Sequence, residues 1–214
     1  MTHPKLVEAM SRPGFYPHRP PSVQLVQTHI SFVFIAGDRV YKVKKAVDFG
    51  FLDFTTLDKR KHFCEEELRL NRRLAPDAYL EVAAIGEDAG GTPVLGGAQP
   101  VEYAVVMRRL PTDRMLKRLL AEGKAGTEAM DAIAAKVADF HRRAETGGRI
   151  DATGGIGTIR RNHDENFEQT ARYIGLTIPR ERYDFLRGWV NRFLERERPL
   201  FEKRVADHRI RDCH

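Results

Sequence analysis

One carboxylate in a predicted helix stands out because it lies among apolar residues. Glu67 follows Phe63 by four positions and precedes Leu70 by three, so the three side chains share one stripe of the helix. A carboxylate on the apolar face of a helix is costly unless a cation meets it. The sequence therefore predicts an ion pair, at least partly buried, that involves Glu67.

Two lysines of the preceding predicted strand are the candidate partners. In the run "RVYKVKK", Val40, Lys42 and Lys44 project to one side of the strand and the intervening residues to the other. An inward-facing lysine also needs an opposite charge, so either lysine satisfies Glu67. Alternation alone does not choose between them. The competing interpretation is that Glu67 reaches solvent at the edge of its stripe while the lysines simply flank the strand.

Composition limits the classes of protein that the chain can represent. Its 214 residues are 31% charged and 42% hydrophobic, as in ordinary soluble domains. No run approaches the roughly 18 apolar residues of a membrane span. Only Cys64 and Cys213 are present, which predicts a reducing cytoplasm rather than a disulfide framework.

The net charge of +6 raises the possibility of a nucleic-acid-binding domain. The basic residues are interspersed with acids along predicted helices, as in "LERERPLFEKR". This pattern favours solvated helix faces over a basic patch. Nucleic acid is therefore the least favoured partner.

Two regions differ in their predicted secondary structure. β-Branched and aromatic residues predict three strands within residues 23–47, and "EVAAIG" and "VEYAVVM" predict two more. A helix is expected between these groups, from Thr55 or Thr56 until a proline ends it. Beyond Pro111 we expect helices and then a short strand at "RIRDC". The fold class is α+β, with five strands, one inserted helix and a helical remainder.

A segment after the third strand resembles a catalytic motif of other proteins. Asp48, Phe49 and Gly50 spell the metal-binding "DFG" of protein kinases, but they lie before the first long helix rather than after a catalytic loop. We expect them to form a connecting loop that packs Phe49, Phe51 and Phe54 into the structure.

The helical region has its own ambiguous motif. A loop is expected over residues 146–166, and its last residues, "NHDEN", are expected to cap a helix that begins near Phe167, although a part in binding an acceptor stays open. A long helix is expected from about Arg180 to Val205.

Several motifs, taken in order, resemble a known family. "RVYK" resembles the third-strand lysine motif of protein kinases, "ELRLNRRL" resembles their C-helix, and "VVMRRLP" resembles a fifth strand that runs into a hinge. Over essentially its whole length the chain resembles the aminoglycoside phosphotransferase-like family of small-molecule kinases. The likeness is to a bacterial branch with stretches such as "DFGFLDF", whose members often continue into a P-loop ATP-binding domain.

The resemblance implies an architecture. It implies a protein-kinase-like fold with a five-stranded antiparallel N-lobe sheet and one C-helix over residues 1–107, a hinge at 108–111, and the front part of a helical C-lobe at 112–214. The strand "RIRDC" would lead into a His-Gly-Asp catalytic loop, in which His214 matches the histidine. The catalytic aspartate and the metal ligands would then follow residue 214, and the fragment is expected to be inactive.

The resemblance also implies a nucleotide site. Lys42, oriented by Glu67, would contact the α- and β-phosphates of ATP, with Lys44 as the second choice. The turn "QTHIS" has no glycine, so the hydroxyls of its Thr28 and Ser31 would replace the phosphate-covering loop. Backbone groups of the hinge would bind adenine beside a gatekeeper residue; these positions are Met107, Arg108, Arg109 and Leu110.

The implied activity is transfer of the γ-phosphate of ATP to a hydroxyl-bearing small molecule, with Mg²⁺ ligands downstream and no metal ligand in this chain. A non-catalytic kinase-like module that binds nucleotide or a partner is the alternative. An incomplete C-lobe would also expose apolar surface, which predicts self-association.

Overall fold

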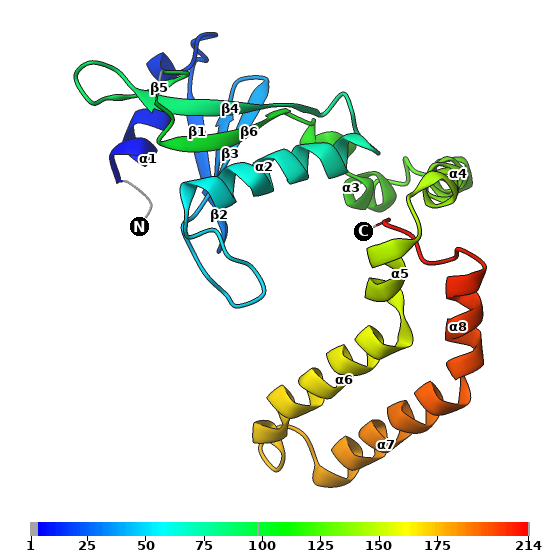
Figure 1. The fold of residues 1–214 in the computed structure, drawn as a ribbon. Helices are drawn as coiled ribbons and strands as arrows, with labels where there is room; N and C mark the ends of the chain where they lie inside the picture. Colours follow the sequence, from blue (N-terminus) through cyan, green and yellow to red (C-terminus); the bar gives the residue numbers. More distant parts are fainter. Residues whose placement is uncertain (1–3, 98, 214) are drawn as a thin grey trace. The chain divides into compact units, whose positions relative to one another are not determined.

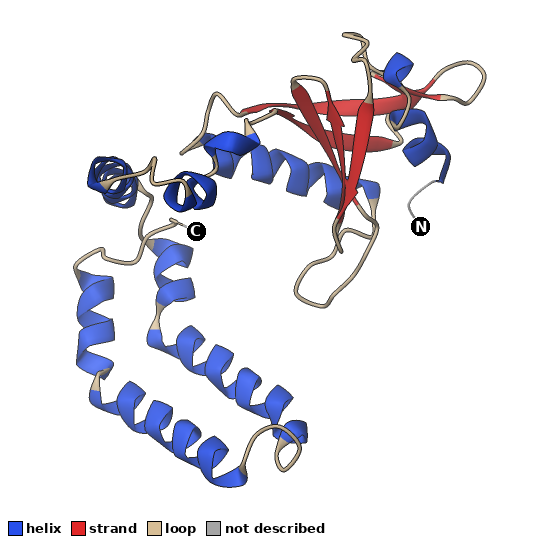
Figure 2. Cartoon of the chain, turned by 180° about the vertical axis from the view of Figure 1, so that it is seen from behind, coloured by secondary structure: helices blue, strands red, loops and turns tan. Residues whose placement is uncertain are grey.

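The computed structural model describes residues 4–97 and 99–213. The chain divides into two compact units, one ending at Gly126 and the other beginning at Thr127. Figures 1 and 2 show that the first unit carries the β-sheet and that the second is built from helices.

The first unit contains a sheet, one long helix and several short helices. Its elements are α1 (Pro4–Met10), a 3-10 turn (Pro13–Phe15), β1 (Val23–Gln27), β2 (Ser31–Ala36), β3 (Arg39–Lys44), α2 (Leu57–Arg72), β4 (Tyr79–Glu87), β5 (Pro93–Leu95), β6 (Glu102–Arg108), a second 3-10 turn (Thr112–Arg114) and α3 (Leu116–Ala121).

The sheet has six antiparallel strands in the order β1-β2-β3-β6-β4-β5. The predicted α+β class is confirmed, but the prediction of a five-stranded, kinase-type N-lobe sheet is wrong. The additional strand is β5, in which Val94 pairs with Gly86 of β4. It forms because the Asp88 carboxylate accepts hydrogen bonds from the amides of Gly90 and Thr92, which closes a tight turn and returns the chain along β4.

One face of the sheet forms the main apolar core. Strand residues such as Phe34 and Tyr41 are buried there against Leu6 and Met10 of α1. Tyr16 joins this core, and its hydroxyl donates a 2.6 Å hydrogen bond to the Met10 carbonyl oxygen. The core therefore fixes the sheet from the side opposite to Lys42 and Lys44, which alternate with its β3 members.

Helix α2 packs on β4 and β6 and carries polar side chains toward the sheet. It begins after Thr56, whose side chain accepts a hydrogen bond from the Lys59 amide as an N-cap. Cys64 and Glu67 follow three residues apart on one face. Since this face carries charge rather than only apolar groups, α2 is held by ion pairs as well as by burial.

The deepest of these ion pairs joins Arg60 of α2 to Glu102 of β6. The Arg60 Nε lies 2.9 and 2.8 Å from the two Glu102 carboxylate oxygens, and both side chains are buried. The Arg60 Nη1 also donates to the carbonyl oxygens of Phe54 and Thr55. This pair joins the start of α2 to the start of β6.

The loop before α2 differs from the prediction. Phe54 is buried and packs edge-to-face on Phe63, with ring centroids 5.1 Å apart. Phe49 and Phe51, expected to pack inward, are 48% and 90% exposed and stack on each other. The bridge between Asp48 and Asp53 closes the loop before these two rings can reach the core.

The second unit contains α4 (Thr127–Arg143), α5 (Gly148–Gly154), α6 (Ile156–Thr170), a 3-10 turn (Ala171–Tyr173), α7 (Arg180–Arg196) and α8 (Arg198–Ala206). The predicted loop over 146–166 is wrong, since α5 and most of α6 occupy it and "NHDEN" lies inside α6. Helix α6 is stabilised by a contact with α7. Phe167 packs on Tyr183, and the Tyr183 hydroxyl donates a hydrogen bond to the Phe167 carbonyl oxygen.

The end of the second unit also departs from the prediction. The expected helix from Arg180 to Val205 is divided between α7 and α8 at Glu197, with a proline in the first turn of α8. Residues 209–213, expected to be a strand, follow an irregular path. They are held by side-chain and backbone contacts, including the Arg211 guanidinium bonded to the Ala144 carbonyl oxygen.

The buried pair gives a stability test of this architecture. We expect Arg60→Met to lower the free energy of unfolding by about 3–5 kcal/mol, because it leaves the buried Glu102 carboxylate without its partner. Urea unfolding followed by circular dichroism measures the change. Lys61→Met, in the exposed pair with Glu65, is the matched control and should cost less than about 1 kcal/mol. Equal losses in the two variants would contradict the assigned role of Arg60.

Candidate functional site

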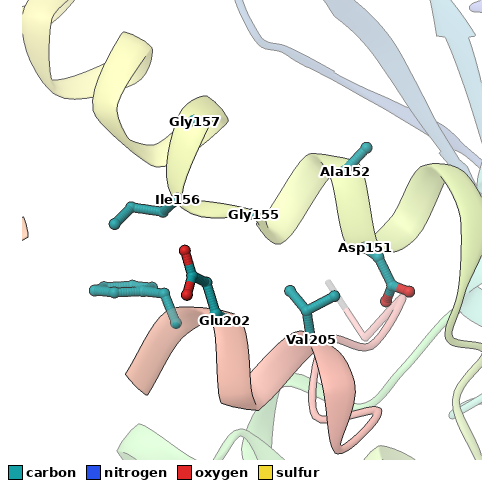
Figure 3. A pocket seen from close by; sticks show the side chains of 8 residues that line it. Asp151, Ala152, Gly155, Ile156, Gly157, Glu202 and Val205 are labelled. Atoms are coloured by element: carbon teal, nitrogen blue, oxygen red, sulfur yellow. The ribbon is translucent and has the colours of Figure 1, made fainter. Parts of the chain in front are cut away.

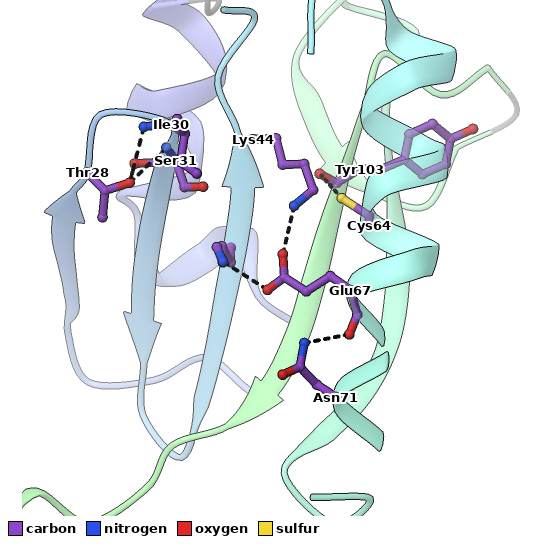
Figure 4. A network of polar contacts seen from close by, with 9 residues as sticks. Thr28, Ile30, Ser31, Lys44, Cys64, Glu67, Asn71 and Tyr103 are labelled. Carbon is purple, nitrogen blue, oxygen red and sulfur yellow. Dashed lines mark hydrogen bonds and ion pairs between the residues drawn. The ribbon is translucent and has the colours of Figure 1, made fainter. Parts of the chain in front are cut away.

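The predicted ion pair forms, and it contains both candidate lysines. The Lys42 Nζ lies 2.9 Å from Glu67 Oε1, and the Lys44 Nζ lies 2.7 Å from Glu67 Oε2. Figure 4 shows Lys44 and Glu67 facing each other between the sheet and α2. One carboxylate thus serves two ammonium groups, so this Lys42–Lys44–Glu67 cluster carries one positive charge in excess.

The positions of the lysines follow from strand pairing. Lys42 lies opposite Val33 of β2 and Val105 of β6, and Lys44 lies opposite Ser31. Because β3 is an inner strand, both lysines project from the interior of the sheet rather than from its edge. Glu67 meets them from α2, where its own carbonyl oxygen accepts a hydrogen bond from the Asn71 side chain.

The two lysines differ in their surroundings. The Lys42 side chain is 28% exposed, whereas that of Lys44 is only 5% exposed and that of Glu67 14%. The Lys44 Nζ also lies 4.9 Å from the centre of the Phe54 ring, a cation–π distance. Lys42 is therefore the ammonium that solvent or a ligand can reach.

The charges of the cluster shift the pKa values of its neighbours. Burial acts to raise the pKa of Glu67, but the hydrogen bond and charge of Lys44, and then those of Lys42, outweigh it, so the pKa lies below its usual value. Burial raises the pKa of the Cys64 thiol to about 12, and the Lys44 charge opposes this only in part. Burial, followed by the Glu67 charge, raises the pKa of Tyr79. Glu67 is thus ionised and Cys64 is a neutral thiol at neutral pH.

The turn between β1 and β2 uses its hydroxyls internally. The Thr28 hydroxyl accepts hydrogen bonds from the amides of Ile30 and Ser31 and donates to the Ser31 carbonyl oxygen. The Ser31 hydroxyl is buried, with no hydrogen-bond partner among the described residues. Thr28 is exposed but its hydroxyl shapes the turn through these bonds, and the buried Ser31 hydroxyl is not presented to solvent in the way that the phosphate-contact hypothesis requires.

The predicted hinge is partly occupied by backbone hydrogen bonds. The Arg108 amide donates to the Ala78 carbonyl oxygen, and the Arg109 amide donates to that of Asp38, each at 2.8 Å. Met107 is half-buried in β6, and Leu110 is exposed. Of the hinge backbone groups expected to bind adenine, the amides of Arg108 and Arg109 are thus already used within the chain.

The remaining site predictions concern His214 and metal binding. His214 lies outside the described residues. Within residues 4–97 and 99–213, no group of three or more His, Cys, Asp or Glu side chains is arranged to hold a metal ion. None of the helices described in the structure has the length and apolar character needed to cross a membrane.

Sequence reasoning missed two members of the cluster's environment. Phe54 lies ten residues beyond Lys44, across a loop, so no local spacing connects them. Cys64 lies three residues before Glu67 and shares its helix face, a signal that could have been found. The Phe54 ring lies under the Lys44 ammonium, and the charge of Lys44 affects the pKa of the Cys64 thiol more than that of Lys42 does.

The second unit contains a separate groove, shown in Figure 3, with a volume of about 450 Å³. Carboxylates from α5 and α8, those of Asp151 and Glu202, lie at this groove, and Phe201 and Val205 contribute apolar walls. Asp151 already accepts a hydrogen bond from the Gly147 amide. The groove contains none of the site residues predicted from the sequence.

The low pKa of Glu67 leads to a pH test. A lowered folded-state pKa means that the ionised carboxylate stabilises the fold above about pH 4.5, and that this stabilisation is lost as the pH falls through the folded-state value. We expect the difference in unfolding free energy between the wild type and Glu67→Gln to be largest near pH 6–7 and to shrink toward about pH 3. The control is Glu65→Gln, on the exposed side of α2. A difference for Glu67→Gln that does not change with pH would contradict the assignment.

Comparison with known proteins finds relatives but no family model. The chain is 33% identical over 194 residues to uncharacterized proteins of Mycobacterium bovis and of two strains of Mycobacterium tuberculosis. Each match covers 91% of this chain and 37% of the relative. The chain thus spans well under half the length of these relatives. No protein-family model matches the chain, and no solved structure matches it.

Proposed function

We propose that the first unit is the phosphate-binding part of an ATP-dependent phosphotransferase, which in a longer protein transfers the γ-phosphoryl group to a hydroxyl-bearing small molecule. The observation that carries this proposal is the sharing of Glu67 by Lys42 and Lys44. The order of the motifs, rather than the sheet, supports the proposed relation to the aminoglycoside phosphotransferase-like family.

The charge balance of the cluster favours an anionic ligand. Lys42 and Lys44 contribute two positive charges and Glu67 one negative charge, so the sum is +1. The neighbouring pair of Arg60 and Glu102 is balanced and leaves this sum unchanged. An excess charge in a partly buried place is costly, and an anion that reaches Lys42 offsets the cost. A phosphate group is such an anion.

Phosphoryl transfer depends on this kind of site. The protein contributes mainly by positioning the phosphates and neutralising their charge. Lys42 can do both, because its ammonium is partly exposed while Glu67 limits its orientation. We assign adenine contacts in the hinge to Leu110, since the Arg108 and Arg109 amides are already used. We assign no metal ligand among the described residues.

A charge-removal experiment tests the proposal. In calorimetric titrations of the 214-residue chain with ATP, we expect Lys42→Met to weaken binding about 100-fold, because a charge-assisted contact to phosphate is lost. Lys45→Met is the matched control. It removes the same charge three residues further along the chain, where the Lys45 ammonium bonds the Thr28 carbonyl oxygen on the other face of the sheet. It should change the affinity by less than about threefold.

Three outcomes separate the possible functions. Wild-type protein that binds no ATP, or equal losses in the two variants, would overturn the proposed phosphate site. ATP binding with phosphoryl transfer by the longer protein would support the phosphotransferase. ATP binding without transfer to any hydroxyl acceptor in that protein would instead favour the non-catalytic module.

The proposed compartment is the cytoplasm. Cys64 and Cys213 are both free thiols. Persistent free thiols are common where the redox environment is reducing.

Apolar side chains on the second unit support a proposal of self-association. Met130, Ile133 and Val137 recur along α4 with exposed side chains, and Phe185 and Trp189 do so on α7. Exposed apolar stripes of this kind promote association. We expect light scattering after size exclusion to give a mass that rises with concentration, and Trp189→Glu to reduce that rise. A monomeric mass at all concentrations would contradict the proposal.

A further inference from the structure

The two lysines of the cluster have unequal surroundings, and this inequality indicates different roles. Lys44 is almost completely buried and has contacts on several sides. Its ammonium bonds Glu67 Oε2 at 2.7 Å and lies over the Phe54 ring, and its charge acts on the Cys64 thiol. Figure 4 shows Lys44 between the strand and the helix that carries Cys64 and Glu67. The Lys42 ammonium bonds the other oxygen of Glu67, and its side chain is more exposed.

We propose that Lys44 is a positioning residue that neutralises Glu67, so that the charge of Lys42 is available to an anionic ligand. This inference rests on the proposed function, because the anion is the phosphate chain of a nucleotide. In the unliganded cluster, Glu67 accepts from both ammonium groups. When Lys42 turns toward a phosphate, Glu67 keeps Lys44 and is not left as an unpaired, mostly buried carboxylate.

Removal of Lys44 changes this balance. In Lys44→Met, Glu67 has only Lys42 as its partner, and the phosphate must compete with the carboxylate for one ammonium. The sum of charges in the cluster falls from +1 to 0. Because of this competition we expect ATP to bind about tenfold more weakly, which corresponds to about 1.4 kcal/mol. Methionine suits the space because its neighbours, Phe54 and Cys64, are apolar groups.

The distinguishing prediction is an asymmetric rescue. In Lys44→Met/Glu67→Gln the competing carboxylate is gone, the charge sum returns to +1, and the charge belongs to the exposed Lys42. We expect the affinity for ATP to return to within about threefold of the wild type. In Lys42→Met/Glu67→Gln the sum is also +1, but the charge belongs to the buried Lys44. We expect no recovery there, because Lys44 does not reach the ligand. A purely structural role of Lys44 predicts no recovery in either double variant.

The experiment measures ATP affinity by calorimetry for the wild type, both single lysine variants and both double variants of the 214-residue chain. Circular dichroism and urea unfolding check that each variant is folded, and Lys44→Gln replaces Lys44→Met if the latter does not fold. Side-chain NMR of ¹⁵N-labelled lysines adds an independent readout. ATP should shift the ammonium signal of Lys42 strongly, and that of Lys44 should stay close to its position.

The outcomes separate the inference from the function on which it rests. No binding by the wild type overturns both. Wild-type binding with equal recovery in the two double variants overturns the inference alone, because net charge and not the identity of the lysine would then govern affinity. Recovery only in Lys42→Met/Glu67→Gln would reverse the two roles. Recovery only in Lys44→Met/Glu67→Gln supports the inference.

Discussion

The first unit depends on how the carboxylate of Glu67 is neutralised. Helix α2 places this carboxylate against an inner strand of the sheet, where solvent reaches little of it. An unpaired charge there would destabilise the packing of α2, and two ammonium groups from β3 compensate for the cost of burying it. The same contacts fix α2 along the strand, because Glu67 must stand between residues 42 and 44. A single interaction thus sets both the position of the helix and the sign of the local charge.

Two groups of ion-paired side chains join α2 to the sheet, and they differ in charge balance and in exposure. The pair of Arg60 and Glu102 is balanced, buried on both sides and bonded further to two backbone carbonyl oxygens. It has little remaining capacity for a ligand. The Lys42–Lys44–Glu67 cluster has one charge in excess, and one of its members is partly exposed. Buried pairs contribute little net stability once their desolvation is counted. The excess charge and partial exposure of the Lys42–Lys44–Glu67 cluster therefore fit the proposed binding of an anion better than a purely stabilising role.

Local patterns in the sequence predict much of the first unit and, in the second, the helices at α4 and at the start of α7, but not α5 and α6. The strands corresponding to β1, β2, β3, β4 and β6 follow from β-branched residues and alternation, and the contact of Glu67 with Lys42 or Lys44 follows from helix and strand periodicity. The three-residue strand β5 is too short to show a period, so its presence depends on the turn at Asp88. Helix α6 depends on the contact of Phe167 with Tyr183, which is distant in sequence. The sharing of Glu67 by two lysines could not be predicted either. Alternation shows on which side of the strand a side chain lies, but not how deeply it is buried.

The additional strand β5 lies away from β3, which carries Lys42 and Lys44. A strand added beyond β4 lies at the sheet edge, whereas β3 lies between β2 and β6. For the proposed nucleotide site, the backbone hydrogen bonds of the predicted hinge matter more than the additional strand does. The Arg108 and Arg109 amides already donate hydrogen bonds to the segments before β4 and β3. They hold the end of β6 in place and are therefore not available to bind a base. If the proposed site binds a nucleotide, we expect the affinity to come mainly from the phosphates. The proposed site is therefore defined by the charge and partial burial of Lys42, and much less by recognition of a base.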